Sequence, residues 1–142
     1  MRVAYRVLAM LVAAGVVVQA AAIAFALFDI EKKTDDGQVF SKDTHNGGIA
    51  LHSALGEMVI PVLALLLLIV SFFAAIPGGV KWAAITFGVL VLQVVLAFAG
   101  DALPAVGVLH AINAFALAAV ASLAMRQARV VGAPQAGASV AV

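Results

Sequence analysis

Residues 49–76 read IALHSALGEMVIPVLALLLLIVSFFAAI, without a lysine or an arginine. A helix needs about 20 apolar residues to cross the hydrocarbon core of a bilayer, so this stretch predicts a membrane-spanning helix with length to spare. Three further apolar stretches of suitable length lie at residues 6–28, 82–99 and 106–125. The sequence therefore predicts an all-α fold, a four-helix transmembrane bundle embedded in the lipid bilayer.

Composition excludes several classes of protein. Of the 142 residues, 65% are hydrophobic and 11% are charged, which is too little polar surface for a water-soluble domain. The chain has no cysteine, which excludes disulfides, thiolate metal centres and covalent attachment of a c-type haem. No basic run lies outside the helix ends, so we expect no nucleic-acid partner. No phosphate-binding loop, nucleophile–base pair or two-carboxylate site is visible, so we expect an electron-transfer or accessory protein rather than an independent enzyme.

The placement of charge predicts the orientation of the bundle. Five basic residues flank helix ends on one side, with no acidic residue among them: Arg2, Arg6, Lys81, Arg126 and Arg129. Under the positive-inside rule this side is cytoplasmic, which makes the chain a multi-pass protein of the cell's inner (plasma) membrane with both termini inside. The outer side holds residues 29–48, which their glycines predict to be a turn-rich loop, either a lid or a connector. Residues 130–142 are expected to form a disordered cytoplasmic tail.

The transmembrane domain, expected at residues 1–129, contains an internal repeat. The first and third spans carry Gln19 and Gln93, and each span is followed by an aspartate. A Leu-His pair then opens the second and the fourth spans, at His52 and His110. These matching positions predict two copies of one helical hairpin, related by an approximate two-fold axis along the membrane normal.

His52 and His110 form the pair best suited to hold a cofactor. The predicted two-fold axis places them at similar depth on different helices, a few residues inside the outer end. Two imidazoles that face each other across this axis supply the axial nitrogens of a six-coordinate iron porphyrin. Gly56 and Ala114 lie about one turn from the histidines. Their small side chains leave space on the helix faces that carry His52 and His110. We therefore predict haem b as the cofactor, with His52 and His110 as the iron ligands.

Gln19 and Gln93 are predicted to lie on the neighbouring helices, a turn or two deeper than the histidines. There they orient an imidazole or join the helices by hydrogen bonds. Two other interpretations of the histidines stay open. They bridge helices without any cofactor, or Asp43, His45 and His52 form a surface metal site.

Further polar residues of the spans have more than one interpretation. Asn113 lies one turn inward from His110, and Glu57 lies between one and two turns inward from His52. Three roles are open for Glu57: a proton relay, a contact with a quinone, or a structural role. Pro61 is predicted to kink the second helix.

With its two hairpins and a histidine near the outer start of the second and fourth spans, the chain resembles one four-helix half of the haem A synthase family. It also resembles other small bis-histidine b-type cytochromes and a group of uncharacterised small four-helix bacterial membrane proteins with a Leu-His near the start of the fourth helix. In the synthase family a Glu lies three residues before the second-helix His and an Arg follows it, whereas this chain has Ile49 and Ser53 there. These departures argue against haem A synthesis, and only His52 and His110 are carried over as ligands.

Together these features predict a b-type haem protein with bis-histidine ligation near the outer face. It would exchange electrons with a quinone or with a larger respiratory or redox complex. Two alternatives are a non-catalytic accessory or assembly subunit of a membrane complex, and a haem- or metal-handling protein. Assembly of the chain into an oligomer is left open by the sequence.

Overall fold

The computed structural model describes residues 1–41 and 43–130. Its regular elements are all helical: α1 (Arg2–Asp35), α2 (Gly47–Ala54), a π-helical segment η1 (Leu55–Val59), α3 (Ile60–Ser71), α4 (Gly79–Ala102) and α5 (Pro104–Val130). Since α2, η1 and α3 form one continuous run, the described residues contain four helices that are long and apolar enough to cross a membrane. The predicted all-α, four-helix architecture is confirmed.

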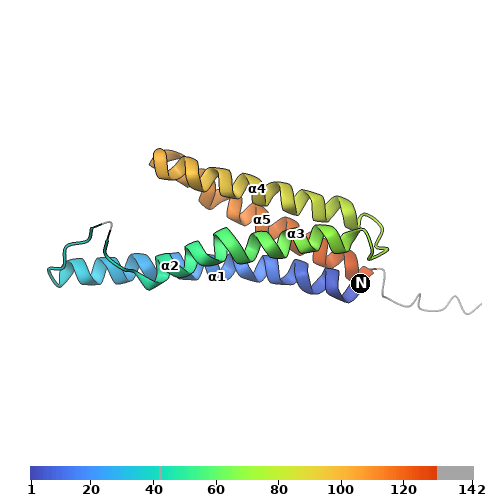
Figure 1. The fold of residues 1–142 in the computed structure, drawn as a ribbon, viewed down its shortest axis with the longest axis horizontal. Helices are drawn as coiled ribbons and strands as arrows, with labels where there is room; N and C mark the ends of the chain where they lie inside the picture. Colours follow the sequence, from blue (N-terminus) through green and yellow to red (C-terminus); the bar gives the residue numbers. More distant parts are fainter. Residues whose placement is uncertain (42, 131–142) are drawn as a thin grey trace, which may run out of the picture.

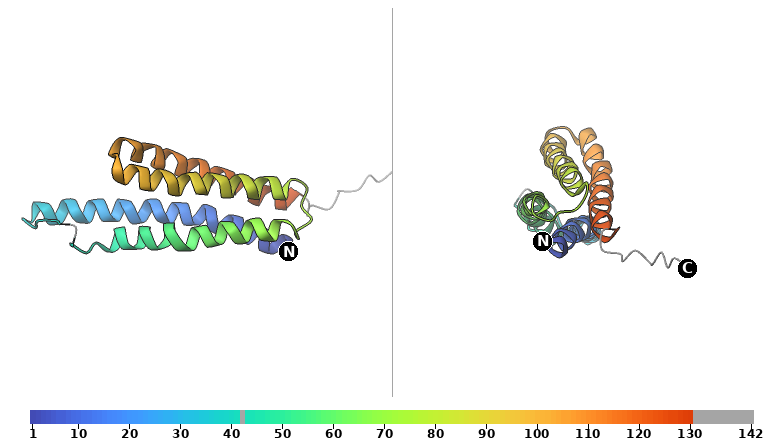
Figure 2. Two further views of the ribbon diagram at one scale, coloured as in Figure 1. Left: turned by 45° about the horizontal axis from the view of Figure 1, so that its top comes forward. Right: turned by 90° about the vertical axis from the view of Figure 1, so that its right-hand side faces the viewer.

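The helices pair into two antiparallel hairpins. The first consists of α1 with the α2–η1–α3 run beside it, and the second consists of α4 and α5 (Figure 1). The N-terminus, the α3–α4 turn and the end of α5 lie at one end of the bundle (Figure 1). Toward the opposite end the two hairpins diverge, as both views in Figure 2 and the view in Figure 1 show.

At the end of the bundle that contains the N-terminus, side chains bind backbone carbonyls of the α3–α4 turn and of the start of α4. The Tyr5 hydroxyl donates to the Gly79 carbonyl (2.9 Å), and Gln127 donates to the Pro77 carbonyl (2.8 Å). Arg2 donates to the Ala75 carbonyl (3.3 Å). Two of these bonds satisfy carbonyls of the α3–α4 turn, and together the three bonds join the start of α1, this turn with the start of α4, and the end of α5 at the basic end of the molecule.

The core consists of small and branched side chains at helical spacing. On α1 the buried positions are Tyr5, Ala9, Val12, Val16, Ala22 and Ala26, a stripe that matches the spacing of a packed helix seam. An inner cluster packs Tyr5, Ala9, Leu67, Ala74, Ile76, Ala83 and Ala124 together. A middle cluster packs Val12, Val16, Ile60, Ala64, Leu90, Leu117 and Ala121. Because many of these residues are alanines, the helices approach closely.

The prediction of a non-helical segment at residues 29–48 is wrong for its first part. Helix α1 continues to Asp35, about two turns beyond the predicted end at residue 28. Lys33 donates to Asp29 (2.8 Å) and Lys32 donates to Asp36 (3.1 Å), both one turn apart, so charge pairs support the extension. The chain leaves the helix just before Gly37, whose φ is +86°.

The second span differs from the predicted helix at residues 49–76. It ends at Ser71, and the chain then turns through Ala75 and Gly78, both with positive φ. Its irregularity lies immediately before Pro61, where η1 replaces a regular α-helical turn. Proline has no N–H to donate to the preceding turn, which favours such a rearrangement.

The other two spans are longer than predicted by up to five residues at an end. Helix α4 covers Gly79–Ala102 rather than 82–99, and α5 covers Pro104–Val130 rather than 106–125. The predicted disordered tail begins one residue inside α5, and residues 131–142 lie outside the described residues. Apolar composition marks the lipid-embedded part of a helix, whereas hydrogen bonding continues into the flanking polar turns.

Candidate functional site

A polar layer replaces the apolar core beyond the middle cluster, toward the acidic end of the bundle. On α1 and α4 the buried stripes continue outward from Val16 and Leu90 to Gln19 and Gln93, which are both half-buried. Each glutamine therefore occupies an interior position, where its polar atoms require partners within the protein.

The structure brings His52 of α2 and His110 of α5 together. Their ring centroids lie 6.3 Å apart with an interplanar angle of 63°, and both side chains are half-buried. They come from different hairpins, so this contact crosses between the two halves of the bundle. The predicted juxtaposition of the two histidines is present in the structure.

Each histidine is oriented by a glutamine backbone carbonyl of its own hairpin. Nδ1 of His52 lies 3.2 Å from the Gln19 carbonyl oxygen, and Nδ1 of His110 lies 3.0 Å from the Gln93 carbonyl oxygen. A carbonyl can only accept, so these contacts place the proton of each neutral ring on Nδ1. The Nε2 atom of each ring then carries the lone pair, which is the arrangement found in metal-binding histidines.

In the second hairpin the polar side chains form a connected network. Asn113 donates from Nδ2 to the Val89 carbonyl (3.1 Å) and to Oε1 of Gln93 (2.7 Å). Nε2 of Gln93 donates to the His110 carbonyl (3.0 Å) and lies against the His110 ring, 3.2 Å from its Nδ1 and 3.1 Å from its Nε2. Asn113 is thus part of the site and lies on the same network as the predicted glutamine.

In the first hairpin the side chain of the corresponding glutamine, Gln19, makes fewer hydrogen bonds than that of Gln93. Oε1 of Gln19 is buried and has no hydrogen-bond partner among the described residues. Leu55 stands three residues after His52, as Asn113 stands three residues after His110, and a leucine cannot donate to the amide.

The small residues near the histidines bring helices into contact. A Cβ atom at Gly48 would lie 2.5 Å from the Ala22 carbonyl oxygen, and one at Gly56 would lie 2.6 Å from Nε2 of Gln19. Both glycines therefore face α1, while Ala114 packs against the middle cluster. Making room for a flat macrocycle at Gly56 requires the Gln19 side chain to move, a condition that the sequence alone did not indicate.

The π-helical segment keeps one side of the second span turned toward α1. A Cβ at Gly15 would lie 3.0 Å from the Ile60 side chain, and Gly56 lies against Gln19 one turn further out. A π-helix rotates less per residue than an α-helix, so the four-residue steps from His52 to Gly56 and on to Ile60 stay in line. Without η1, the histidine and Ile60 would not face α1 together.

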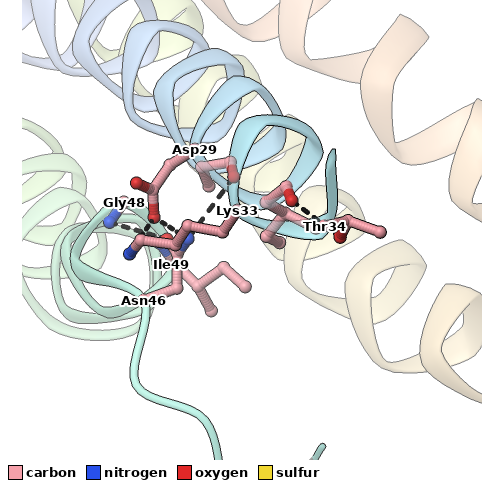
Figure 3. A network of polar contacts seen from close by, with 8 residues as sticks. Asp29, Lys33, Thr34, Asn46, Gly48 and Ile49 are labelled. Atoms are coloured by element: carbon pink, nitrogen blue, oxygen red, sulfur yellow. Dashed lines mark hydrogen bonds and ion pairs between the residues drawn. The ribbon is translucent and has the colours of Figure 1, made fainter. Parts of the chain in front are cut away.

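Asn46, which sequence reasoning missed, positions the start of α2 (Figure 3). Its Oδ1 accepts from the backbone N–H groups of Gly48 and Ile49, both at 3.0 Å, which caps the helix. Its Nδ2 donates to the Ala26 carbonyl (3.3 Å) and to Asp29 (3.1 Å) on α1. The Asn-Gly-Gly run before an apolar stretch was the available signal, because asparagine is a favoured N-cap residue.

The remaining candidates lie apart from this layer. His45 and Asp43 are exposed in the α1–α2 connection, and Glu57 is exposed on η1. The described residues contain no group of three or more His, Asp or Glu side chains able to hold a metal ion, so the alternative surface site of Asp43, His45 and His52 is wrong.

No family model, curated protein or solved structure matches the chain. The histidine pair and its hydrogen bonds therefore carry any functional assignment.

Proposed function

We propose that the chain is a membrane-embedded b-type haem protein in which His52 and His110 bind the iron from opposite faces of the porphyrin. When bound, haem supplies one-electron redox chemistry. We place the site in the outer half of an inner (plasma) membrane, with the basic end and both termini in the cytoplasm. The protein would then exchange electrons at the outer face with a quinone or with a larger redox complex.

The observation that carries this proposal is the 6.3 Å separation of the two imidazole centroids. A metal–imidazole bond is about 2 Å long and the ring centre lies roughly 1 Å further, so two imidazoles on opposite sides of one metal have centres about 6 Å apart. The orientation of both Nδ1 atoms toward carbonyls adds to this support, because it leaves each Nε2 able to bind.

The number of donors also favours a porphyrin over a bare metal ion. A structural zinc site takes about four protein ligands, and a catalytic one about three. Only two imidazoles meet here, and a porphyrin provides four equatorial nitrogens itself, so that two protein ligands complete the coordination of its iron.

The residues of the site would each have a defined task. His52 and His110 would bind the iron, and the carbonyls of Gln19 and Gln93 would hold the proton of each ring at Nδ1. These matched contacts in the two hairpins also support the proposed internal repeat. The hairpins diverge toward this end of the bundle (Figure 2), and the Gln19 side chain beside Gly56 would move to admit the macrocycle.

The first test is an absorption spectrum of the protein purified in mild detergent, before and after dithionite, with a pyridine haemochrome assay for stoichiometry. We expect b-type bands and about one haem per chain, as a single bis-histidine pair allows. His52→Ala and His110→Ala should each lower haem retention, while His45→Ala, at an exposed histidine of the loop, should not.

A colourless protein that also fails to take up added haem would contradict the proposal. The histidines would then join helices through their Nδ1 contacts, and the accessory or assembly subunit would be the better assignment. Equal haem retention in all three alanine variants would instead overturn the choice of ligands.

A further inference from the structure

Glu57 is an acidic residue near the midpoint of a membrane-spanning helix. It lies in the span Gly47–Ser71, and no other aspartate or glutamate occurs between Asp43 and Asp101. Its side chain is exposed, and among the described residues no hydrogen bond or ion pair holds its carboxyl group. In a bilayer, a carboxyl group at this depth meets hydrocarbon unless a partner from outside the chain covers it.

The second span has an exposed side opposite to the side that packs on α1. The residues that contact α1 follow one another in steps of four: Gly48, His52, Gly56 and Ile60. Positions two residues further along lie roughly 200° around the helix axis, and therefore on the opposite side. All of these are exposed: Ala50, Ala54, Met58 and Val62. These four residues, together with Glu57 beside Met58, are called the exposed stripe.

The second hairpin has an apolar residue at the place that corresponds to Glu57. Phe115 lies five residues after His110, as Glu57 lies five residues after His52, and Phe115 is 78% exposed. A phenylalanine side chain needs no polar partner in lipid, whereas a carboxyl group does. An exposed polar side chain in the middle of a span therefore distinguishes the first hairpin from the second.

The chemistry of the carboxyl group indicates which partner fits. In its neutral form the group has an O–H donor and acceptor oxygens, so two carboxyl groups can donate to each other. Two copies of the chain that are related by a two-fold axis along the membrane normal hold Glu57 at equal depth. The small side chains of Ala50 and Ala54, one to two turns away, let two helix backbones approach closely. A second copy of this chain thus meets the chemical and the geometric requirement together.

We propose that two copies of the chain associate in the membrane through the exposed stripe, with their Glu57 carboxyl groups hydrogen-bonded to each other. The contact is isologous, because each copy presents the same residues to the other. Hydrogen bonds between helices stabilise association within a bilayer, where burial of apolar surface supplies no driving force. The exposed stripe lies on the side of the span opposite to α1, so the contact does not depend on the haem site.

The geometry is tested by cross-linking, because the chain has no cysteine and one substitution introduces the only thiol. The variants are Met58→Cys in the exposed stripe and, as the matched control, Ala116→Cys, at an exposed residue six positions after His110. A disulfide needs two Cα atoms within about 7 Å of each other, so it reports direct contact. In lipid vesicles with copper phenanthroline, we expect Met58→Cys to form linked dimers about tenfold faster than Ala116→Cys.

The role of the carboxyl group is tested by the dissociation constant of the dimer, measured by sedimentation equilibrium of the full-length protein in mild detergent. Glu57→Leu should raise this constant about tenfold, the factor expected for two interhelical hydrogen bonds. Glu57→Gln should retain most of the affinity, because an amide also donates and accepts. Phe115→Leu, at the corresponding position of the second hairpin, is the matched control and should leave the constant unchanged.

The two tests can fail separately. A protein that stays monomeric in detergent, with equal cross-linking of Met58→Cys and Ala116→Cys in vesicles, would overturn the association. A dimer whose dissociation constant is the same in Glu57→Leu as in the wild type would overturn the role of the carboxyl group. Neither measurement requires haem, so failure of this association and failure of the proposed function are distinguishable.

Discussion

The two hairpins place the same residue types at corresponding positions, yet their polar layers differ. In the second hairpin Asn113 connects the Val89 carbonyl to Gln93 and, through it, to His110. In the first hairpin the Gln19 oxygen is buried without a partner, and a π-helical segment follows His52. One side chain, asparagine or leucine three residues after the histidine, accounts for much of this difference. Two hairpins with matching residue types thus hold one imidazole by a polar side-chain network and the other at a backbone carbonyl.

The hairpins also differ in how their helices are connected at the acidic end of the bundle. The first closes through a long connection anchored by Asn46, and the second through a single residue, Leu103, between α4 and α5. Both rely on close backbone approach near the histidine layer, at Gly48 in the first hairpin and at Gly100 in the second. Three sets of substitutions separate these contributions.

The largest effect is expected from Gly48→Ala. The added Cβ would lie 2.5 Å from the Ala22 carbonyl oxygen and 2.8 Å from backbone and side-chain atoms of Ala26, so α2 must move away from α1. We expect a loss of about 2–3 kcal/mol in the free energy of unfolding, measured by SDS titration in detergent with circular dichroism. Gly47→Ala is the matched control, because nothing lies within 4 Å of its Cβ.

The second hairpin should respond to the same test at one glycine of its close pair. A Cβ at Gly100 would lie 2.8 Å from the Gly107 Cα, whereas a Cβ at Gly107 would lie 3.9 Å from the Gly100 Cα. Gly100→Ala should therefore destabilise the protein and Gly107→Ala should be tolerated.

For the test in the first hairpin, equal stabilities of the Gly47→Ala and Gly48→Ala variants would contradict the prediction, because they would show that the α1–α2 contact relaxes without cost.

A smaller effect is expected from Asn46→Ala, which acts on the first hairpin alone. The change removes the helix cap and the bonds to Ala26 and Asp29, so it should cost about 1–2 kcal/mol. Limited proteolysis should cut the α1–α2 connection faster in the variant. Gln38→Ala, at an exposed residue of the same connection, is the control, and equal cleavage of both would contradict the anchoring role.

The smallest effect, and the most direct comparison of the hairpins, comes from replacing each glutamine by methionine. Gln93→Met removes the partner of Asn113 and His110 and should cost about 1 kcal/mol. Gln19→Met removes a buried acceptor that has no partner, so the unfolding free energy should be unchanged or slightly higher. If the same SDS titration gave both variants the same loss, the two polar layers would be energetically equivalent.

The sequence by itself determined the number of spans and the helical class, and it singled out His52 and His110 as a pair. These follow from composition and spacing, since a run of about 20 apolar residues can satisfy its backbone in lipid only as a helix or within a closed barrel, and its length favours a helix. The asparagine cap at Asn46 was also readable from sequence, although it was missed. The helical extension to Asp35 required charge pairs that a hydropathy pattern does not report.

Only the tertiary structure decided how the polar side chains meet. The 6.3 Å approach of the histidine rings depends on how the two hairpins pack, and the alignment of His52, Gly56 and Ile60 depends on the π-helical segment. The structure also showed that Gly56 lies against Gln19 rather than beside an open space. Hydrogen bonds between helices depend on register and rotation to within about an ångström, and neither quantity is specified by residues within a single helix.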